Sequence, residues 1–277
     1  MRIRNLLRIP YTMAVLLPFL VFDGNGRSNN TKDETQVSRS NSVSAAQAQF
    51  NTYTYVISLS ENQSFVRGVK DTVQALPGGV HKFIFEPDDK PGYKIFVWDK
   101  LLTDNFPQWE KELYYASGCN CADEKRIDMS TKVRRRSKND AVEDYGFPKN
   151  NAYHELGHAF DNMLFELYFT GEVQETKDKY YSYHSGEFKD AYDADLKELK
   201  EKIKAGKIPK DEADRILRSY YLEETESISG KEETFAEIFC MIMLEFEADN
   251  SWKDDFKRIL NFLSYYPRCK QVVLNQI

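Results

Sequence analysis

Two histidines and a glutamate within one short stretch carry the clearest chemical signal in this chain. His154, Glu155 and His158 lie in the sequence NNAYHELGHAFDNM, residues 150–163, although the whole chain has only four histidines. The apolar residues around them recur at helical spacing, which predicts a helix that begins near Pro148. Positions i and i+4 of a helix share one face, so the two imidazoles project towards one point. This H-E-x-x-H pattern is typical of helices in which two histidines hold zinc and the glutamate acts as general base.

A catalytic zinc needs a third protein ligand. Metzincins have a glycine three residues and a histidine six residues after the second histidine, but Asp161 and Leu164 occupy those positions here, which excludes that class. The two remaining histidines, His81 and His184, lie in a strand-like stretch and a tyrosine-rich, loop-like stretch, and we expect neither to bind metal. A glutamate ligand is the other common solution.

A second predicted helix offers that glutamate. The sequence SGKEETFAEIFCMIMLEF, residues 229–246, is apolar on one side, and Glu233 and Glu237 lie at i and i+4 on the other. A pair of carboxylates flanked by large apolar residues is costly to bury without a cation. Bound zinc would allow one glutamate to ligate it and the other to accept the free N–H of a liganding histidine. The alternative is an acidic helix face in contact with solvent.

Three segments together resemble one protease family. HELGHAFDN, ETFAEIF and the C-terminal YPRCKQVVLNQI are similar to the catalytic domain of anthrax lethal factor and to the secreted Pro-Pro endopeptidases. The resemblance implies a zincin-type metalloprotease domain of the α+β class, a gluzincin-type Zn²⁺ site, and close helix packing at Gly157. It implies that His154, His158 and Glu233 bind the zinc, that Glu155 is the catalytic base, and that Glu237 and Asp161 support the ligands.

The chain departs from this family at one position. The family has a tyrosine seven residues before the ligand glutamate, where its hydroxyl stabilises the tetrahedral intermediate, but this chain has Glu226 there. Tyr220 and Tyr221 lie a little further upstream. We take Tyr221 as the candidate for the stabilising hydroxyl.

Composition limits the remaining function classes. The chain has 277 residues, enough for one substantial domain, and a net charge of −6 with mixed signs, which argues against a nucleic-acid surface. The basic run KVRRRSK, residues 132–138, is short and isolated, so we expect a solvated loop there. We expect a protein or peptide substrate, no nucleic-acid partner and a monomeric protein.

The N-terminal residues are typical of a secretory signal. Arginines at positions 2, 4 and 8 precede a short apolar run, residues 9–22, which is too short for a comfortable membrane span. We expect a signal peptide over residues 1–26 and a flexible linker or pro-segment over residues 27–50, rich in Ser, Asn, Thr and Gln. A membrane anchor is the alternative. The expected metalloprotease domain is residues 51–277, secreted and without stable membrane insertion after removal of the signal.

The four cysteines fit export in one way and metal binding in another. If the protein is exported, Cys119 or Cys121 can pair with Cys240 or Cys269, since the first two are too close for an easy mutual bond. A C-x-C zinc site is the rival interpretation. It lacks a matching second pair in the sequence, so we do not favour it.

The middle of the chain predicts a small twisted sheet followed by helices, an α+β arrangement. Residues 124–129 are predicted as a strand just before the active helix; the segment RIDM within them is our candidate for a sheet edge to which an extended substrate peptide adds as a further strand. Other predicted strands are 51–59, 80–87 and 92–99, the last two as a hairpin. The predicted helices are 60–76, opened by a Ser-x-x-Gln capping box, a short helix at 106–116, and a helical hairpin at 188–224.

These patterns predict a secreted zinc endopeptidase that hydrolyses peptide bonds in an extended polypeptide. The resemblance to Pro-Pro endopeptidases suggests proline near the cut, and Trp98 is a candidate aromatic surface for such a substrate. Basic residues upstream of the cut, as lethal factor prefers, are the alternative, since Glu223, Glu224 and Glu226 could attract them. Two other functions stay open, a non-catalytic peptide-binding module on a zincin fold and the effector subunit of a delivered toxin.

Overall fold

The computed structural model describes residues 54–135, 139–146, 148–169, 179–217, 230–246 and 264–277. All of them fall within the unit formed by residues 41–277. The expected signal peptide (1–26) and linker (27–50) lie outside the described residues. Among the helices that are described, none is both long and apolar enough to cross a membrane.

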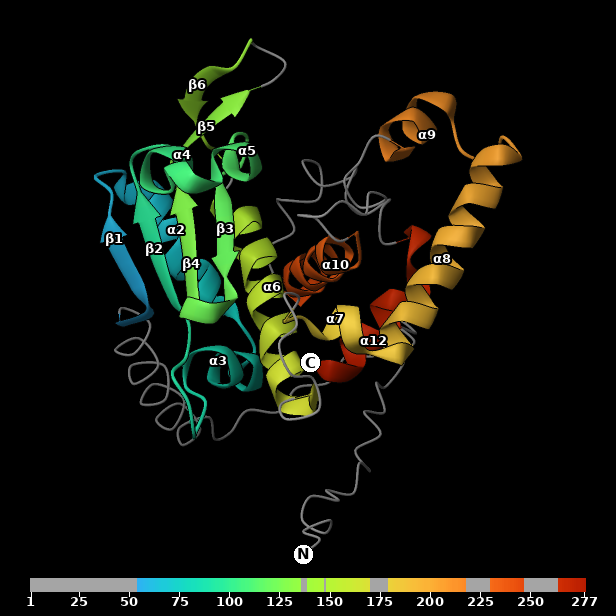
Figure 1. The fold of residues 1–277 in the computed structure, drawn as a ribbon, viewed down its shortest axis with the longest axis horizontal. Coiled ribbons are helices and arrows are strands. Elements are labelled where there is room, and N and C mark those ends of the chain that lie inside the picture. The colour runs from blue at the N-terminus through green and yellow to red at the C-terminus, as the bar shows by residue number, and fades with distance from the viewer. Residues whose placement is uncertain (1–53, 136–138, 147, 170–178, 218–229, 247–263) are drawn as a thin grey trace, which may run out of the picture. The chain divides into compact units, whose positions relative to one another are not determined.

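A four-stranded sheet forms one half of the described structure (Figure 1). The strand order is β1-β2-β4-β3, in which β1, β2 and β4 are parallel and β3 runs antiparallel to β4. The strands are β1 (Val56–Leu59), β2 (Lys94–Trp98), β3 (Gly118–Cys121) and β4 (Arg126–Ser130), and a separate hairpin is formed by β5 (Lys132–Arg135) and β6 (Ala141–Asp144).

One face of this sheet is apolar and packs against helices. Ile95 and Val97 of β2 and Ile127 and Met129 of β4 are fully buried in the main core, with side chains from α2 (Gln63–Ala75) and α6. Because side chains alternate along a strand, the intervening residues of β2 and β4 face the opposite side of the sheet. The register aligns the strands so that each apolar row continues across the sheet.

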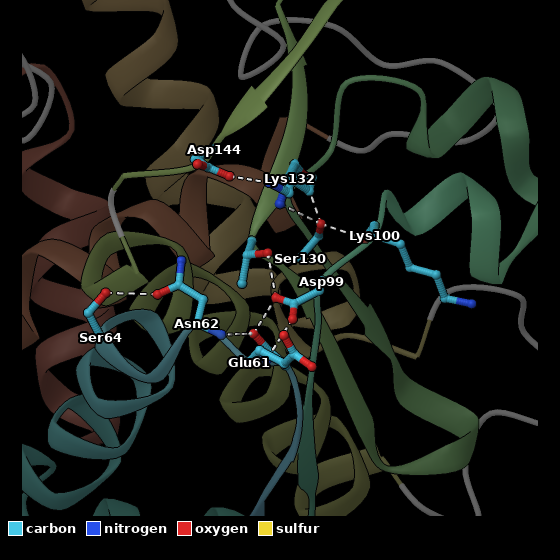
Figure 2. Close-up of polar contacts among 10 residues, drawn as sticks. Glu61, Asn62, Ser64, Asp99, Lys100, Ser130, Lys132 and Asp144 are labelled. Atoms are coloured by element: carbon cyan, nitrogen blue, oxygen red, sulfur yellow. Dashed lines mark hydrogen bonds and ion pairs between the residues drawn. The ribbon is translucent and has the colours of Figure 1, made fainter.

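Hydrogen bonds tie the carboxyl ends of the three parallel strands together. The Asp99 carboxylate, just after β2, accepts from the Ser60 hydroxyl after β1, from the Glu61 amide at 2.5 Å and from the Thr131 hydroxyl at 3.0 Å. Figure 2 shows Asp99 beside Ser130, whose hydroxyl is 2.7 Å from the carbonyl oxygens of the residues at 100 and 132. These side-chain hydrogen bonds hold the ends of the three strands next to one another.

Helix α6 (Pro148–Phe169) is the central element, because it contacts the sheet on one side and α10 (Gly230–Phe246) on the other (Figure 1). Its buried positions lie all round the helix, which is typical of a helix enclosed by others. The remaining helices are α3 (Gly78–Phe85), α4 (Leu102–Asn105), η1 (Pro107–Trp109), α5 (Glu110–Leu113), η2 (Ala122–Glu124), α7 (Tyr181–His184), α8 (Gly186–Lys204), α9 (Lys210–Leu217) and α12 (Pro267–Gln276).

The structure has a small sheet and mostly helices, which is compatible with the predicted α+β class. The hairpin prediction is wrong in its first half, since residues 78–85 form α3. Its apolar residues Val80 and Ile84 lie four apart and are buried together, so helical spacing prevailed over alternation. The helix at 60–76 is confirmed as α2, but its N-cap is Asn62, whose side chain accepts from the Phe65 amide, in place of the expected capping box.

Two predictions near the sheet edge are also wrong. The segment within Arg126–Met129 belongs to β4, which pairs on both sides, so the edge next to it is β3. The basic run that we expected as a solvated loop begins with β5, where Val133 is buried. The short helix at 106–116 is present as η1 and α5, and α8 and α9 confirm the helical hairpin over its described residues.

Candidate metal centre

The two histidines of the H-E-x-x-H stretch lie one turn apart on α6, as the spacing predicts. The rings of His154 and His158 are nearly perpendicular, at 85°, with centroids 4.8 Å apart. Their Nε2 atoms face each other at 3.2 Å. Two ring nitrogens at this distance need either a shared proton or a common cation between them.

Helix α10 brings two carboxylates to the same point. Glu233 places one oxygen 3.2 Å from His154 Nε2 and the other 3.6 Å from His158 Nε2. Glu237, one turn later, lies 3.1 Å from the other ring nitrogen of His154, Nδ1. The structure therefore brings together four of the residues that the sequence singled out on these two helices, His154, His158, Glu233 and Glu237.

A glycine allows the two helices to approach this closely. An ideal Cβ on Gly157 would lie 2.7 Å from both the Cα and the carbonyl oxygen of Ala236. Gly157 lies between His154 and His158 on α6, and Ala236 lies between Glu233 and Glu237 on α10. Close packing at Gly157, which the family resemblance implied, is present.

The hydrogen bond to Glu237 sets the tautomer of His154. Because a carboxylate accepts, Nδ1 of His154 must carry a hydrogen. In the neutral ring Nε2 would then have the lone pair, directed at His158 and Glu233, whereas in the charged ring both nitrogens donate. A carboxylate behind a histidine in this way fixes the ring and raises its basicity as a metal ligand.

The three inner donor atoms fit zinc. Ligand atoms 2.0–2.1 Å from a tetrahedral zinc lie about 3.3–3.4 Å from one another. The separations here are 3.2 Å between the two nitrogens, and 3.2 and 3.6 Å from the nitrogens to the Glu233 oxygens. His154, His158 and Glu233 are thus spaced for one common ion. The roles of the individual residues stay predictions.

The electrostatics of the cluster favour a cation. Burial alone would raise the pKa of Glu233, but the charge of His158 and hydrogen bonds with both histidines hold that pKa well below its ordinary value. Burial would lower the pKa of His158, but the charge and hydrogen bond of Glu233 raise it. Without metal, the site attracts a proton for the same reason that it would attract a metal ion.

Glu155 lies beside this cluster and is 5% exposed. Burial raises the pKa of its carboxyl above the ordinary value, and the charges of His154 and His158 oppose that shift. Its side chain packs against the edge strand, where an ideal Cβ on Gly118 would lie 2.4 Å from Glu155 Oε1. The glutamate therefore occupies space that any other residue at position 118 would fill.

Asp161 lies one turn after His158 and anchors the chain that follows. Its fully buried carboxylate accepts from the Ser182 amide at 2.8 Å and from the Ser182 hydroxyl at 2.5 Å. Burial raises the pKa of Asp161 to about 7, although these hydrogen bonds oppose the shift. Asp161 thus contacts the start of α7 through Ser182.

Two residues near the cluster were missed by sequence reasoning. The ring of Tyr180 packs edge-on against His158, with centroids 6.0 Å apart, and burial raises its pKa well above the ordinary value. Gly118 is the other. Neither carries a local sequence signal, since only the packing of α7 and the order of the strands bring them to α6. The predicted Tyr221, with Tyr220 and Glu226, lies outside the described residues.

The other two histidines and Trp98 lie elsewhere. His81 packs against Tyr55 and Phe85, and His184 packs against Phe165 and Phe169, so both pack on aromatic rings away from the cluster. Trp98 is on the face of the sheet opposite the core.

The disulfide that we expected for an exported chain is absent, because none of the four cysteines is in a disulfide bond. Cys240 of α10 and Cys269 of α12 are buried within the helical half, where Cys240 contacts the Asn150 carbonyl, and Cys119 and Cys121 lie in the edge strand of the sheet. Cys119 and Cys121 therefore lie in a different part of the fold from Cys240 and Cys269.

Comparisons with known proteins found no match, whether with protein-family models, with curated proteins or with solved structures.

Proposed function

We propose that this chain is a zinc-dependent endopeptidase on a zincin-type fold, related to the lethal factor and Pro-Pro endopeptidase family. The observation that carries the proposal is the convergence of His154, His158 and Glu233 at zinc-ligand spacing. A buried Glu155 lies beside them and supplies the base that a purely structural zinc site would not need. The family resemblance in three sequence segments supports the same assignment.

The residues present fit the roles that peptide hydrolysis requires. Bound zinc would polarise the scissile carbonyl and lower the pKa of the attacking water. Glu155 would take the proton from that water and deliver it to the leaving amine, and burial raises the pKa of its carboxyl in the direction that favours accepting a proton. Glu237 would hold the His154 ring in the tautomer that keeps Nε2 free.

The edge strand β3 is the proposed docking site for the substrate. It pairs with β4 on one side, and no strand pairs with its other side among the described residues. An extended peptide that adds to this side would be fixed by main-chain hydrogen bonds and would pass next to Gly118, which contacts Glu155. The substrate class is an extended polypeptide, with proline near the cut as the expected preference. Export by the N-terminal segment remains part of the proposal.

Cleavage by the purified chain, without residues 1–26, tests this function. We expect hydrolysis of members of a peptide library, loss of hydrolysis with a chelator, and recovery with zinc. Glu155→Gln should bind zinc as the wild type does and cleave at least 100-fold more slowly, within the range for a lost general base. Undiminished turnover in that variant would remove Glu155 from the mechanism, and absence of cleavage by zinc-loaded wild type across the library would favour a peptide-binding module.

Metal analysis of single variants tests the ligand assignment. We expect Glu233→Ala to lose the zinc of this cluster, and Glu237→Ala to bind that zinc about 10–100-fold more weakly, the usual loss for a residue that supports a ligand. Glu245→Ala, on the same helix and paired with Lys270 near the surface, is the matched control and should bind zinc normally. Loss of zinc in Glu237→Ala alone would mean that the two glutamates have the opposite roles.

A further inference from the structure

The face of the sheet opposite the core carries a second group of metal-binding side chains. Cys119 and Cys121 are two apart on the edge strand β3, so both side chains point to the same face. Asp128 of β4 lies directly across from Cys119 in the antiparallel register. The two sulfur atoms and an Asp128 oxygen all lie within 4.8 Å of one another.

This group faces away from the histidine cluster. Gly118 and Asn120, which alternate with the cysteines, face α6: a Cβ on Gly118 would meet Glu155, and the Asn120 amide reaches the Glu155 carbonyl at 3.5 Å. The cysteines therefore lie on the other side of β3, and an ion held there would be distinct from the one held by His154, His158 and Glu233.

Asp128 is an unusual residue for the middle of a sheet, since its carboxylate is fully buried. Oδ1 accepts from the Trp98 indole at 2.6 Å and from the Arg126 guanidinium at 2.7 Å. Oδ2 lies 2.6 Å from Arg126 Nε, but it makes no well-directed hydrogen bond. A carboxylate oxygen has two acceptor positions, so Oδ2 keeps one for a further partner.

We propose that Cys119, Cys121 and Asp128 form a second metal site, for a thiophilic ion such as Zn²⁺. Two thiolates and a carboxylate suit a tetrahedral zinc with a fourth, open position. Such a site would carry one net negative charge, which Arg126 neutralises while it holds the carboxylate in place. Asp128 supplies the partner that the C-x-C motif lacks in the sequence, because it reaches the cysteines only through the strand pairing.

The geometry favours a metal over a bond between the two cysteines. Residues i and i+2 of a strand are about 6.6–6.8 Å apart at Cα, at the upper limit of the range for disulfides. Both thiols are free in the structure and partly exposed. A metal ion with sulfur bonds of about 2.3 Å bridges two such side chains without bending the strand.

Cobalt or cadmium binding to the full purified chain, in the presence of a reductant, tests this proposal. Only thiolate ligands give the intense near-ultraviolet charge-transfer band of these ions, so the band reports this site and not the histidine site. We expect two metal ions per wild-type chain and one thiolate band. Cys119→Ser and Cys121→Ser should each lose the band and bind one ion. His154→Ala should also bind one ion and keep the band, and the matched control Cys240→Ala, which alters a buried cysteine elsewhere, should keep both ions.

Asp128→Asn should weaken metal binding at this site. A second measurement uses the wild type alone, in case that variant fails to fold. Zinc should protect two thiols of the wild type from a thiol reagent and leave the labelling of the two buried cysteines unchanged. The proposal is overturned if the wild type has no thiolate band or if the band survives in Cys119→Ser. It is also overturned if a folded Asp128→Asn binds the metal at this site with undiminished affinity, or if zinc does not protect two thiols from the reagent. Failure of this site would leave the histidine cluster unaffected.

Discussion

Replacing Gly157 by alanine should separate the two helices that form the metal centre. The added Cβ would lie 2.7 Å from the Cα and the carbonyl oxygen of Ala236, whereas ordinary contact begins at 3.4 Å. The obstructing atoms belong to the backbone of α10, so no side chain can turn away. The helices must therefore move apart by about 0.7 Å or more at this point.

That displacement is large compared with the tolerance of a zinc site. Ligand distances must hold within about 0.2 Å, and Glu233 lies one turn from Ala236 on the same helix. We expect zinc affinity to fall at least tenfold, which corresponds to about 1.4 kcal/mol. Overpacking of the core should lower the free energy of unfolding by about 1–3 kcal/mol. Helix propensity alone would change stability in the opposite direction, by up to about 1 kcal/mol, so the sign of the effect is informative.

Zinc titration and thermal unfolding, both begun from the metal-free chain, measure the two effects. Gly79→Ala on α3 is the matched control, since no atom lies within 4 Å of its added Cβ. That control should bind zinc as the wild type does and be equally stable or up to about 1 kcal/mol more stable, the change that helix propensity alone predicts. A Gly157→Ala protein with unchanged zinc affinity and unchanged or higher stability would refute the close approach of α6 and α10 as the basis of the site.

Three further predictions concern residues around the cluster. Gly118→Ala should keep zinc but cleave at least tenfold more slowly, because the added Cβ displaces the Glu155 carboxylate. That carboxylate is the end of a flexible side chain, so folding should be little affected. Equal turnover of variant and wild type in kinetic assays would argue against this contact. Burial raises the pKa of Asp161 to about 7, so its contribution to stability is greatest when it is protonated and is lost as pH rises through 7. In urea unfolding with a chelator present, the wild type should lose up to about 1.4 kcal/mol per pH unit between about pH 4 and 7 relative to Asp161→Asn, and little more above pH 7. A pH-independent difference would contradict this. Tyr221→Phe should lower the maximal rate of cleavage about 100-fold without loss of zinc if its hydroxyl stabilises the intermediate. Tyr180→Phe keeps the ring contact with His158 and should change that rate only a few-fold. The reverse result would assign the stabilising hydroxyl to Tyr180.

The sequence predicted the helical part of the site well because the signal there is local. His154 and His158 share a face of α6 through spacing alone, and Glu233 and Glu237 do the same on α10. That the two helices meet was an inference from the cost of buried carboxylates, and Gly157 was the one residue that marked the contact.

The sheet was harder to predict because the sequence of one strand does not indicate which strands lie beside it. RIDM reads as a strand, but only the pairing of β3 beside it decides which of the two is the edge. The run VHKFIF fits both alternation and helical spacing, and the packing of Val80 and Ile84 into the core decided for a helix. For the same reason, Asp128 could not be linked with the cysteines from the sequence.

The wide separation of the donor groups along the chain affects when the site can exist during folding. His154 and Glu237 are 83 residues apart, and they meet only after α10 packs against α6. Contacts between distant segments carry a loop-closure cost and tend to form late. The histidine pair exists once α6 has formed, whereas the full set of ligands requires both halves of the domain. If the chain is the peptidase that we propose, it has no complete site while it is partly folded, so a chain that is still folding cannot cleave its neighbours.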